Sequence, residues 1–110
     1  MDVELTRESD KLLAMLYKLY LDRRAAGESR SDSKYFGSSD DILTNLLICE
    51  SRDDIDDWCR ELSCKRYLDC LFSDDTISEA WLTDNAIIYL ENRFKNGVLA
   101  VADFLSKFIP

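Results

Sequence analysis

Residues 51–84 read SRDDIDDWCRELSCKRYLDCLFSDDTISEAWLTD, and partway along this stretch the hydrophobic pattern changes from helical to extended. Ser51 is a good N-cap residue, and Asp54 follows it at the spacing of a capping box in which Asp replaces the usual Glu. We therefore predict a helix over residues 52–63. Its apolar residues share one face: Ile55, Trp58, Cys59 and Leu62.

The second half of this stretch predicts a β-hairpin. Residues 67–72 are mostly strand formers, residues 73–75 (Ser-Asp-Asp) form a turn signal, and residues 76–82 make a second extended run. Alternate residues of a strand point to the same side, so one face of the hairpin is apolar and can lie on the helices. That face would hold Leu68, Cys70, Phe72, Ala80 and Leu82.

The chain before this stretch predicts two more helices. Residues 6–26 carry apolar residues at helical spacing and end before a glycine, whereas residues 28–39 are rich in serine and predict a flexible loop, with a short strand at 34–36. Ser39 followed by two aspartates is a helix start signal, because side-chain oxygens and carboxylates meet the unpaired amides of a first turn. We predict a short, largely buried helix over residues 40–49.

After the hairpin, Thr83 is expected to cap one long helix over residues 84–107, with Gly97 as its weak point. The apolar residues of this segment repeat every three or four positions and form a continuous stripe. They are Ile87, Leu90, Phe94, Val98, Val101, Leu105 and Phe108. The sequence thus predicts a mainly α fold with a small β-hairpin, an α+β class.

Length and composition limit the possible functions. The chain has 110 residues, 46% of them hydrophobic, which suits a single domain spanning residues 1–110. It has no histidine and therefore lacks the commonest general base. It has only three glycines, too few to form a glycine-rich phosphate-binding loop. We therefore expect a protein that is not an enzyme and needs no cofactor. A thiol or carboxylate enzyme is the third-ranked alternative.

The cysteines and the N-terminal residues bear on location. Acids at positions 2, 4, 8 and 10 replace the basic and apolar regions of a signal peptide, and no uncharged stretch is long enough to span a bilayer. We expect a cytoplasmic protein without membrane contact. Its four cysteines have no C-x-x-C spacing and should be free thiols that fill the core, with no metal site. They are Cys49, Cys59, Cys64 and Cys70.

The order of these elements, a helix, a loop, two short capped helices, a hairpin and a terminal helix, resembles the winged helix-turn-helix superfamily of bacteria and phages. Residues 39–92 carry the resemblance, above all Trp81-Leu82-Thr83-Asp84-Asn85-Ala86, which resembles the junction between the wing and the following helix. The resemblance implies that the helix of residues 52–63 is a recognition helix and that the hairpin is a wing. A superfamily of this kind implies little about function.

The charge of the predicted recognition helix argues against ordinary DNA binding. Residues 40–61 hold eight acidic and only two basic residues, and so carry six of the chain's eight net negative charges. A like-charged surface repels the DNA backbone. One interpretation is that these acids cap helices and keep a face soluble. The other is that they bind a basic surface of a partner protein, through Asp53, Asp54, Asp56, Asp57 and Glu61.

The terminal helix predicts a second interface. It would expose apolar residues on two sides beyond Gly97, and in dimeric winged-helix proteins the corresponding helix often builds the subunit contact. We therefore expect a two-fold homodimer through residues 98–109, with an interface formed by Val98, Val101, Leu105 and Phe108. The alternative is that the helix folds back along the first helix and completes the core of one chain.

Two functional hypotheses follow from these patterns. The first is a non-enzymatic interaction module, an acidic adaptor or inhibitor from a prokaryote or phage that engages a basic partner surface; a small anti-CRISPR-like inhibitor belongs to this class. The alternative is a dimeric transcriptional regulator that contacts DNA through Lys65 and Arg66 at the base of the wing. Those two side chains would instead be structural if they paired with Glu61 or Asp69.

Overall fold

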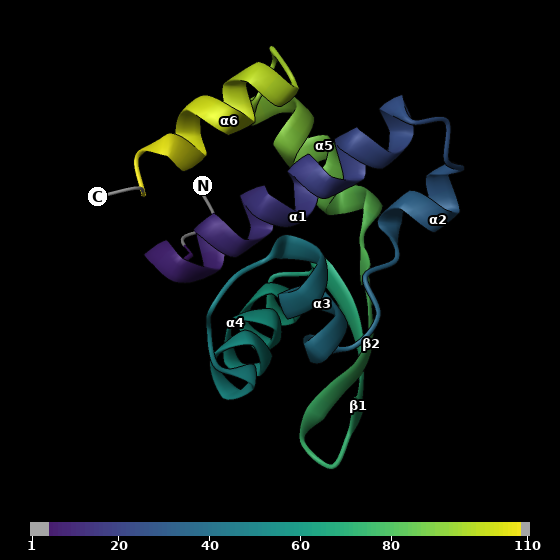
Figure 1. The fold of residues 1–110 in the computed structure, drawn as a ribbon, viewed down its shortest axis with the longest axis vertical. Coiled ribbons are helices and arrows are strands. Elements are labelled where there is room, and N and C mark those ends of the chain that lie inside the picture. The colour runs from purple at the N-terminus through teal and green to yellow at the C-terminus, as the bar shows by residue number, and fades with distance from the viewer. Residues whose placement is uncertain (1–4, 109–110) are drawn as a thin grey trace.

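The predicted α+β class is confirmed by the structure, a computed structural model that describes residues 5–108 (Figure 1). Helices and a single two-stranded hairpin make up its described elements. In chain order these are α1 (Arg7–Ala25), α2 (Arg30–Lys34), α3 (Ser39–Leu46), α4 (Arg52–Cys64), β1 (Leu68–Ser73), β2 (Thr76–Leu82), α5 (Asp84–Arg93) and α6 (Val98–Ser106).

Helix α1 is the centre of the fold, with α6 on one side of it and α3 and α4 on the other (Figure 1). The side chain of Thr6 caps its first turn by accepting a hydrogen bond from the amide of Ser9. Apolar side chains at helical spacing are buried along its length: Leu12, Leu13, Ala14, Leu16, Tyr17 and Tyr20. Each fully buried leucine contributes about 1.5–3 kcal/mol to the stability of the fold, so α1 holds the helices on both of its sides together.

The two short helices begin at side-chain caps, but one cap differs from the prediction. Ser38, and not Ser39, starts α3, in a capping box where Asp41 accepts a hydrogen bond from the Ser38 amide. Ser39 is instead buried in the first turn. Helix α3 is shorter than the predicted 40–49, because Leu47 adopts left-handed backbone angles (φ 54°) and ends it. Ser51 caps α4 as predicted, by accepting from the amide of Asp54.

The hairpin forms as predicted, but its facing is irregular near the tip. Strands β1 and β2 are antiparallel, and the register shifts between Leu71 and Phe72. The shift is a β-bulge, which changes the side to which later residues point. Leu68, before the bulge, is buried as predicted. Beyond the bulge Ile77 is buried, whereas Phe72, predicted to lie on the apolar face, is 43% exposed.

The segment predicted as a flexible loop is more ordered than expected. It contains α2, in which Arg30 and Lys34 both donate to the carboxylate of Asp84 at the start of α5 (3.0 and 3.1 Å). Tyr35 then forms an isolated bridge to Trp81 on the outer side of β2. The expected strand at 34–36 is thus reduced to one bridging residue.

The predicted single helix over residues 84–107 is wrong. Thr83 does cap α5, by accepting from the amide of Ala86, but the helix stops at Arg93 and the chain turns at Gly97 (φ 61°) before α6 begins. Arg93 holds this corner against α1 through two hydrogen bonds to Asp10 (2.6 and 2.9 Å). A straight helix would carry apolar residues into solvent, and the turn lets them cover α1 instead.

The fold-back alternative is therefore what the structure shows for the C-terminal segment. Of the four residues expected at a dimer interface, Val101 is fully buried within the chain, and Leu105 and Phe108 are half-buried near α1. Val98 remains exposed. Most of the apolar stripe thus packs against the core of its own chain. Ile109, which was also expected to add apolar surface, lies outside the described residues.

Candidate functional site

The acids of α4 fall into three structural groups: three are exposed, one is buried, and one is partly exposed and hydrogen-bonded to another helix cap. Asp53, Asp54 and Asp57 are exposed. Asp53 and Asp54 lie in the first turn, where a carboxylate interacts favourably with the helix dipole. Asp57 lies beyond that turn, so the dipole gives it no comparable role. These three carboxylates are the part of the predicted partner-binding set that is available to another molecule.

Asp56 does not belong to the surface on which the sequence analysis placed it. Its side chain is only 4% exposed and points into the junction between α4 and the hairpin. It accepts hydrogen bonds from the hydroxyl of Thr76 (2.9 Å) and from the amide of Ile77 (3.0 Å). The helical face predicted from residue spacing was wrong at this position because the hairpin packs there and supplies donors for a buried carboxylate.

Glu61 is also used inside the chain. It accepts hydrogen bonds from the amide and the hydroxyl of Thr6, both at 2.8 Å, and so holds the start of α1 against α4. Burial disfavours its ionised form, but the hydrogen bonds from Thr6 outweigh that effect and lower the pKa of the carboxyl below its usual value. Lys65 and Arg66 would be structural if they paired with Glu61 or Asp69. Within the described residues they form no ion pair with either carboxylate.

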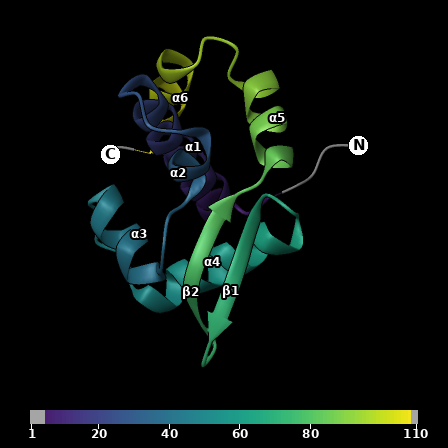
Figure 2. The same ribbon diagram turned by 90° about the vertical axis from the view of Figure 1, so that its right-hand side faces the viewer.

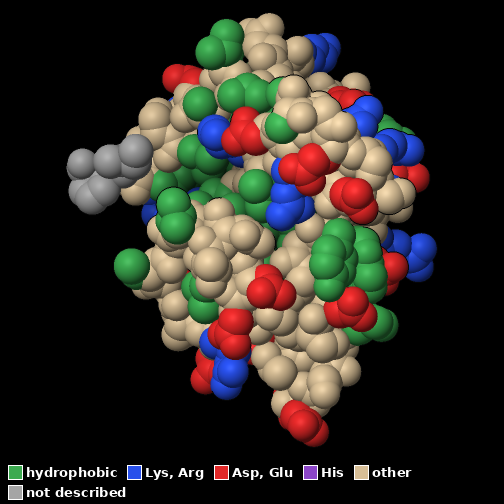
Figure 3. Space-filling view, turned by 45° about the vertical axis from the view of Figure 1, so that its right-hand side comes forward, with side chains coloured by type: hydrophobic (Ala, Val, Ile, Leu, Met, Phe, Trp, Pro, Cys, Tyr) green, Lys and Arg blue, Asp and Glu red, His purple; other side chains and the backbone are tan. Residues whose placement is uncertain are grey.

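The start of α3 adds two exposed carboxylates, Asp40 and Asp41, next to those of α4. The three elements meet at Thr76, whose hydroxyl lies 3.2 Å from the Ser39 hydroxyl of α3 and donates to Asp56 of α4. We call the five exposed carboxylates of α3 and α4 the acidic surface; they are Asp40, Asp41, Asp53, Asp54 and Asp57. The hairpin tip beyond it is acidic too, as Figure 3 shows at the lower end of the molecule.

Nearby cations do little to neutralise this surface. Arg52 lies 3.7 Å from Asp40, an exposed pair of the kind that contributes little. Arg60 donates to the backbone carbonyl of Asp75 in the hairpin turn (2.6 Å) and its guanidinium lies over the ring of Phe72. Arg52 thus lies between the acids of α3 and α4, and Arg60 is held against the hairpin.

The predicted nucleic-acid contact, Lys65 and Arg66, lies at the opposite end of α4. Both side chains are exposed, and Arg66 has left-handed backbone angles (φ 65°) where the chain turns from α4 into β1. Asp56, in the first half of α4, contacts Thr76 near the hairpin tip, whereas the C-terminal end of α4 at Cys64 leads into the base of the hairpin. The second half of α4 therefore separates the two basic residues from the acidic surface.

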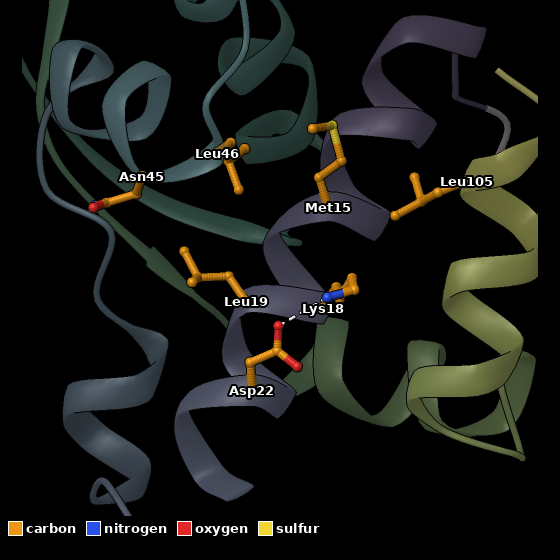
Figure 4. Close-up of a pocket in the computed structure, with 7 residues that line it drawn as sticks. All are labelled: Met15, Lys18, Leu19, Asp22, Asn45, Leu46 and Leu105. Atoms are coloured by element: carbon orange, nitrogen blue, oxygen red, sulfur yellow. Dashed lines mark hydrogen bonds and ion pairs between the residues drawn. The ribbon is translucent and has the colours of Figure 1, made fainter. Parts of the chain in front are cut away.

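A groove beside α1 was not predicted from the sequence. It holds a cavity of about 190 Å³ between α1, α3 and α6 (Figure 4). Met15, Leu19, Leu46 and Leu105 supply apolar walls, and the ion pair of Lys18 with Asp22 (2.9 Å) lies at its rim. Met15 also lines two neighbouring cavities. The sequence signal was indirect, because the groove exists only where α6 turns back beside α1 and leaves a gap between itself and α3.

The cysteines are all free thiols, as predicted, and two of them are poor nucleophiles. Burial raises the pKa of the Cys59 thiol far above its usual value and that of Cys70 to about 11. Cys49 and Cys64 are exposed, so the prediction that the cysteines fill the core is wrong for these two. Within residues 5–108, no three cysteine or acidic side chains are arranged to hold a metal ion, and no helix there is long and apolar enough to cross a membrane.

Comparisons with protein families, with curated proteins and with solved structures find no match.

Proposed function

We propose that the chain is a winged-helix domain in which α4 takes the position of the recognition helix and the hairpin that of the wing. Three features support this proposal. Helices α3 and α4 follow each other through a short connection, the hairpin comes directly after α4, and Tyr35 bridges to Trp81 on the outer side of β2. The bridge gives β2 a neighbour on each side, as in a small three-stranded winged-helix sheet (Figure 2).

We further propose that the acidic surface binds a basic surface of another protein, and that the chain is a non-enzymatic adaptor or inhibitor. The observation that carries this proposal is the exposure of Asp53, Asp54 and Asp57 on the helix that a winged-helix protein would present to DNA. Carboxylates there repel every phosphate they face, whereas they speed association with a cationic protein. An inhibitor of prokaryotic defence encoded by a phage, of the anti-CRISPR-like kind, is one member of this class.

Solubility alone is the competing explanation for the acidic surface, and the two predict different results. The test captures proteins from a lysate of the source cells on the immobilised wild-type chain and on the D53K/D57K variant. Both substitutions are exposed, so the variant should stay folded. A matched control, E91K/D103K, makes the same change in net charge at exposed positions of α5 and α6.

The proposal expects a protein with a basic surface that wild type and E91K/D103K retain and D53K/D57K loses. With that partner purified, the association rate should fall steeply with ionic strength, since charges more than about 10 Å apart are screened at 0.1 M salt. Equal capture by all three chains, or equal loss in both variants, would show that the acids only keep the protein soluble.

A DNA-binding regulator remains the alternative function, supported by the exposure of Lys65 and Arg66. It predicts a complex with duplex DNA that weakens steeply with salt and disappears in K65A/R66A. If random-sequence duplex DNA at low salt shows no gel shift, this alternative is ruled out.

A further inference from the structure

Among the described strands, none lies beside the outer edge of β1. Within residues 5–108 the sheet contains only β1 and β2, and the Tyr35 bridge lies on the β2 side (Figure 2). Two apolar side chains of β1 are also exposed, Leu71 at 50% and Phe72 at 43%. An open strand edge with exposed apolar side chains is a template for pairing with another strand.

The hydrogen-bond pattern identifies the groups at this edge. The amide of Thr83 donates to the carbonyl of Tyr67 (3.2 Å), so these two residues form a hydrogen-bonded pair. Pairs alternate in an antiparallel ladder, and therefore Asp69 turns its backbone groups toward β2 while Leu68 and Cys70 turn theirs outward. The hydrogen bonds of β2 follow the same alternation. Ala80 lies opposite Cys70, and its carbonyl turns away from β1 and accepts from the Phe36 amide (2.8 Å).

Charge at the two ends of this edge indicates what covers it. Lys65 and Arg66 precede β1, and Asp74 and Asp75 follow it in the hairpin turn. All four side chains are exposed, and none takes part in an ion pair within the described residues. A strand with one basic end and one acidic end is complementary to itself when a copy of it runs antiparallel.

We propose that β1 pairs edge to edge with β1 of a second copy of this chain, about a two-fold axis at Cys70, to form a four-stranded antiparallel sheet. In this register Leu68 lies opposite Phe72 of the second copy, and Asp69 lies opposite Leu71. Lys65 and Arg66 then lie beside Asp75 and Asp74 of the second copy. The outward backbone groups of both strands gain partners together, and the contact is isologous, as a two-fold dimer requires.

Neighbouring registers are less favourable. The outward groups pair only if even-numbered residues face even-numbered ones, so the axis can move by one residue along the strand at a time. An axis at Asp69 places two Asp69 carboxylates directly opposite each other, which is destabilising. An axis at Leu71 places Arg66 opposite Thr76 and loses both charge pairs. The Cys70 register alone among these three pairs each basic residue with an acidic one.

This interface is independent of the acidic surface on α3 and α4. It uses the edge of β1 and the hairpin tip, and it replaces the predicted dimer contact of the C-terminal stripe, most of which is buried against the chain's own core. It would also occupy Lys65 and Arg66, so the dimer would compete with DNA binding through these residues.

The test measures molar mass by light scattering on the full chain and on three charge variants. Wild type should show twice the chain mass of 12.8 kDa. K65E/R66E and D74K/D75K each place like charges together and should shift the mass to that of one chain. The variant that combines all four substitutions restores opposite charges with reversed sign and should be a dimer again. E91K/D103K, with exposed charges away from the edge, should remain a dimer.

A wild-type monomer at the highest soluble concentration would overturn the proposal, as would unchanged dimer mass in both two-residue variants. A dimer that persists in these variants but is lost in V98E/L99E would assign the contact to the C-terminal stripe. Asp74 and Asp75 have left-handed backbone angles, which lysine adopts less readily. Amide hydrogen exchange of wild type therefore provides a second measurement: protection of the Leu68 and Cys70 amides that grows with concentration supports the dimer, and rapid exchange at every concentration refutes it.

Discussion

Replacing Asp56 by alanine removes the carboxylate that ties α4 to the hairpin. It accepts two hydrogen bonds, from the Thr76 hydroxyl at 2.9 Å, which is partly buried, and from the Ile77 amide at 3.0 Å, which is buried. A hydrogen bond to a charged group contributes about 1.5–3 kcal/mol. The Ile77 amide would also stay buried without a partner, so we expect D56A to lower the free energy of unfolding by about 3 kcal/mol.

Two further variants separate the hydrogen bonds from charge and helix propensity. D56N keeps one acceptor for the Ile77 amide and should cost about 1 kcal/mol. D57A removes the neighbouring exposed carboxylate and should change stability by no more than about 0.5 kcal/mol. The assay is urea unfolding at pH 7, followed by circular dichroism and tryptophan fluorescence, with equal m-values as a check on the denatured state. A D56A chain as stable as D57A would refute the structural role assigned to this carboxylate.

Two other predictions concern local contacts. Hydrogen bonds from Thr6 lower the pKa of Glu61, so the stabilising contribution of this carboxylate is present above the unfolded pKa near 4.5 and is lost as the pH falls through the lower folded pKa. E61Q should therefore flatten the decline in stability below pH 4.5, measured by urea titrations across that range. An unchanged profile would contradict this prediction. Gly37 and Gly27 both have positive φ, but an added Cβ meets the Asp41 side chain at Gly37 and nothing within 4 Å at Gly27. Thermal unfolding should therefore show a larger loss of stability for G37A than for G27A. Equal losses of stability would mean that backbone strain alone determines the effect of both substitutions.

Local sequence rules correctly placed most of the elements. Ser51 and Thr83 were identified as helix caps because capping depends on a side chain and the amides two or three residues further on. The hairpin was identified from the change to alternating residues and from its acidic turn. The same rules placed the start of α3 one residue late, because Ser38 and Ser39 are both competent caps and the packing of Ser39 against Thr76 selects between them.

The candidate site was only partly accessible to sequence reasoning. The acidity of α4 was evident from residue types, and three of its five predicted carboxylates do face solvent. Asp56 and Glu61 were misassigned because helical spacing says which residues share a face but not which other element lies against that face. In this chain the hairpin covers Asp56 and the start of α1 covers Glu61.

Residue types and their spacing were enough to predict the class of the fold, the main helix starts and the concentration of negative charge in residues 40–61, since all of these depend on near neighbours in the chain. Three features became apparent only in the folded chain: the C-terminal stripe turns at Gly97 and covers α1, Asp56 is buried, and no described strand lies beside the outer edge of β1. Each of these depends on contacts between residues distant in sequence, where burial of apolar surface and pairing of buried polar groups outweigh local preference.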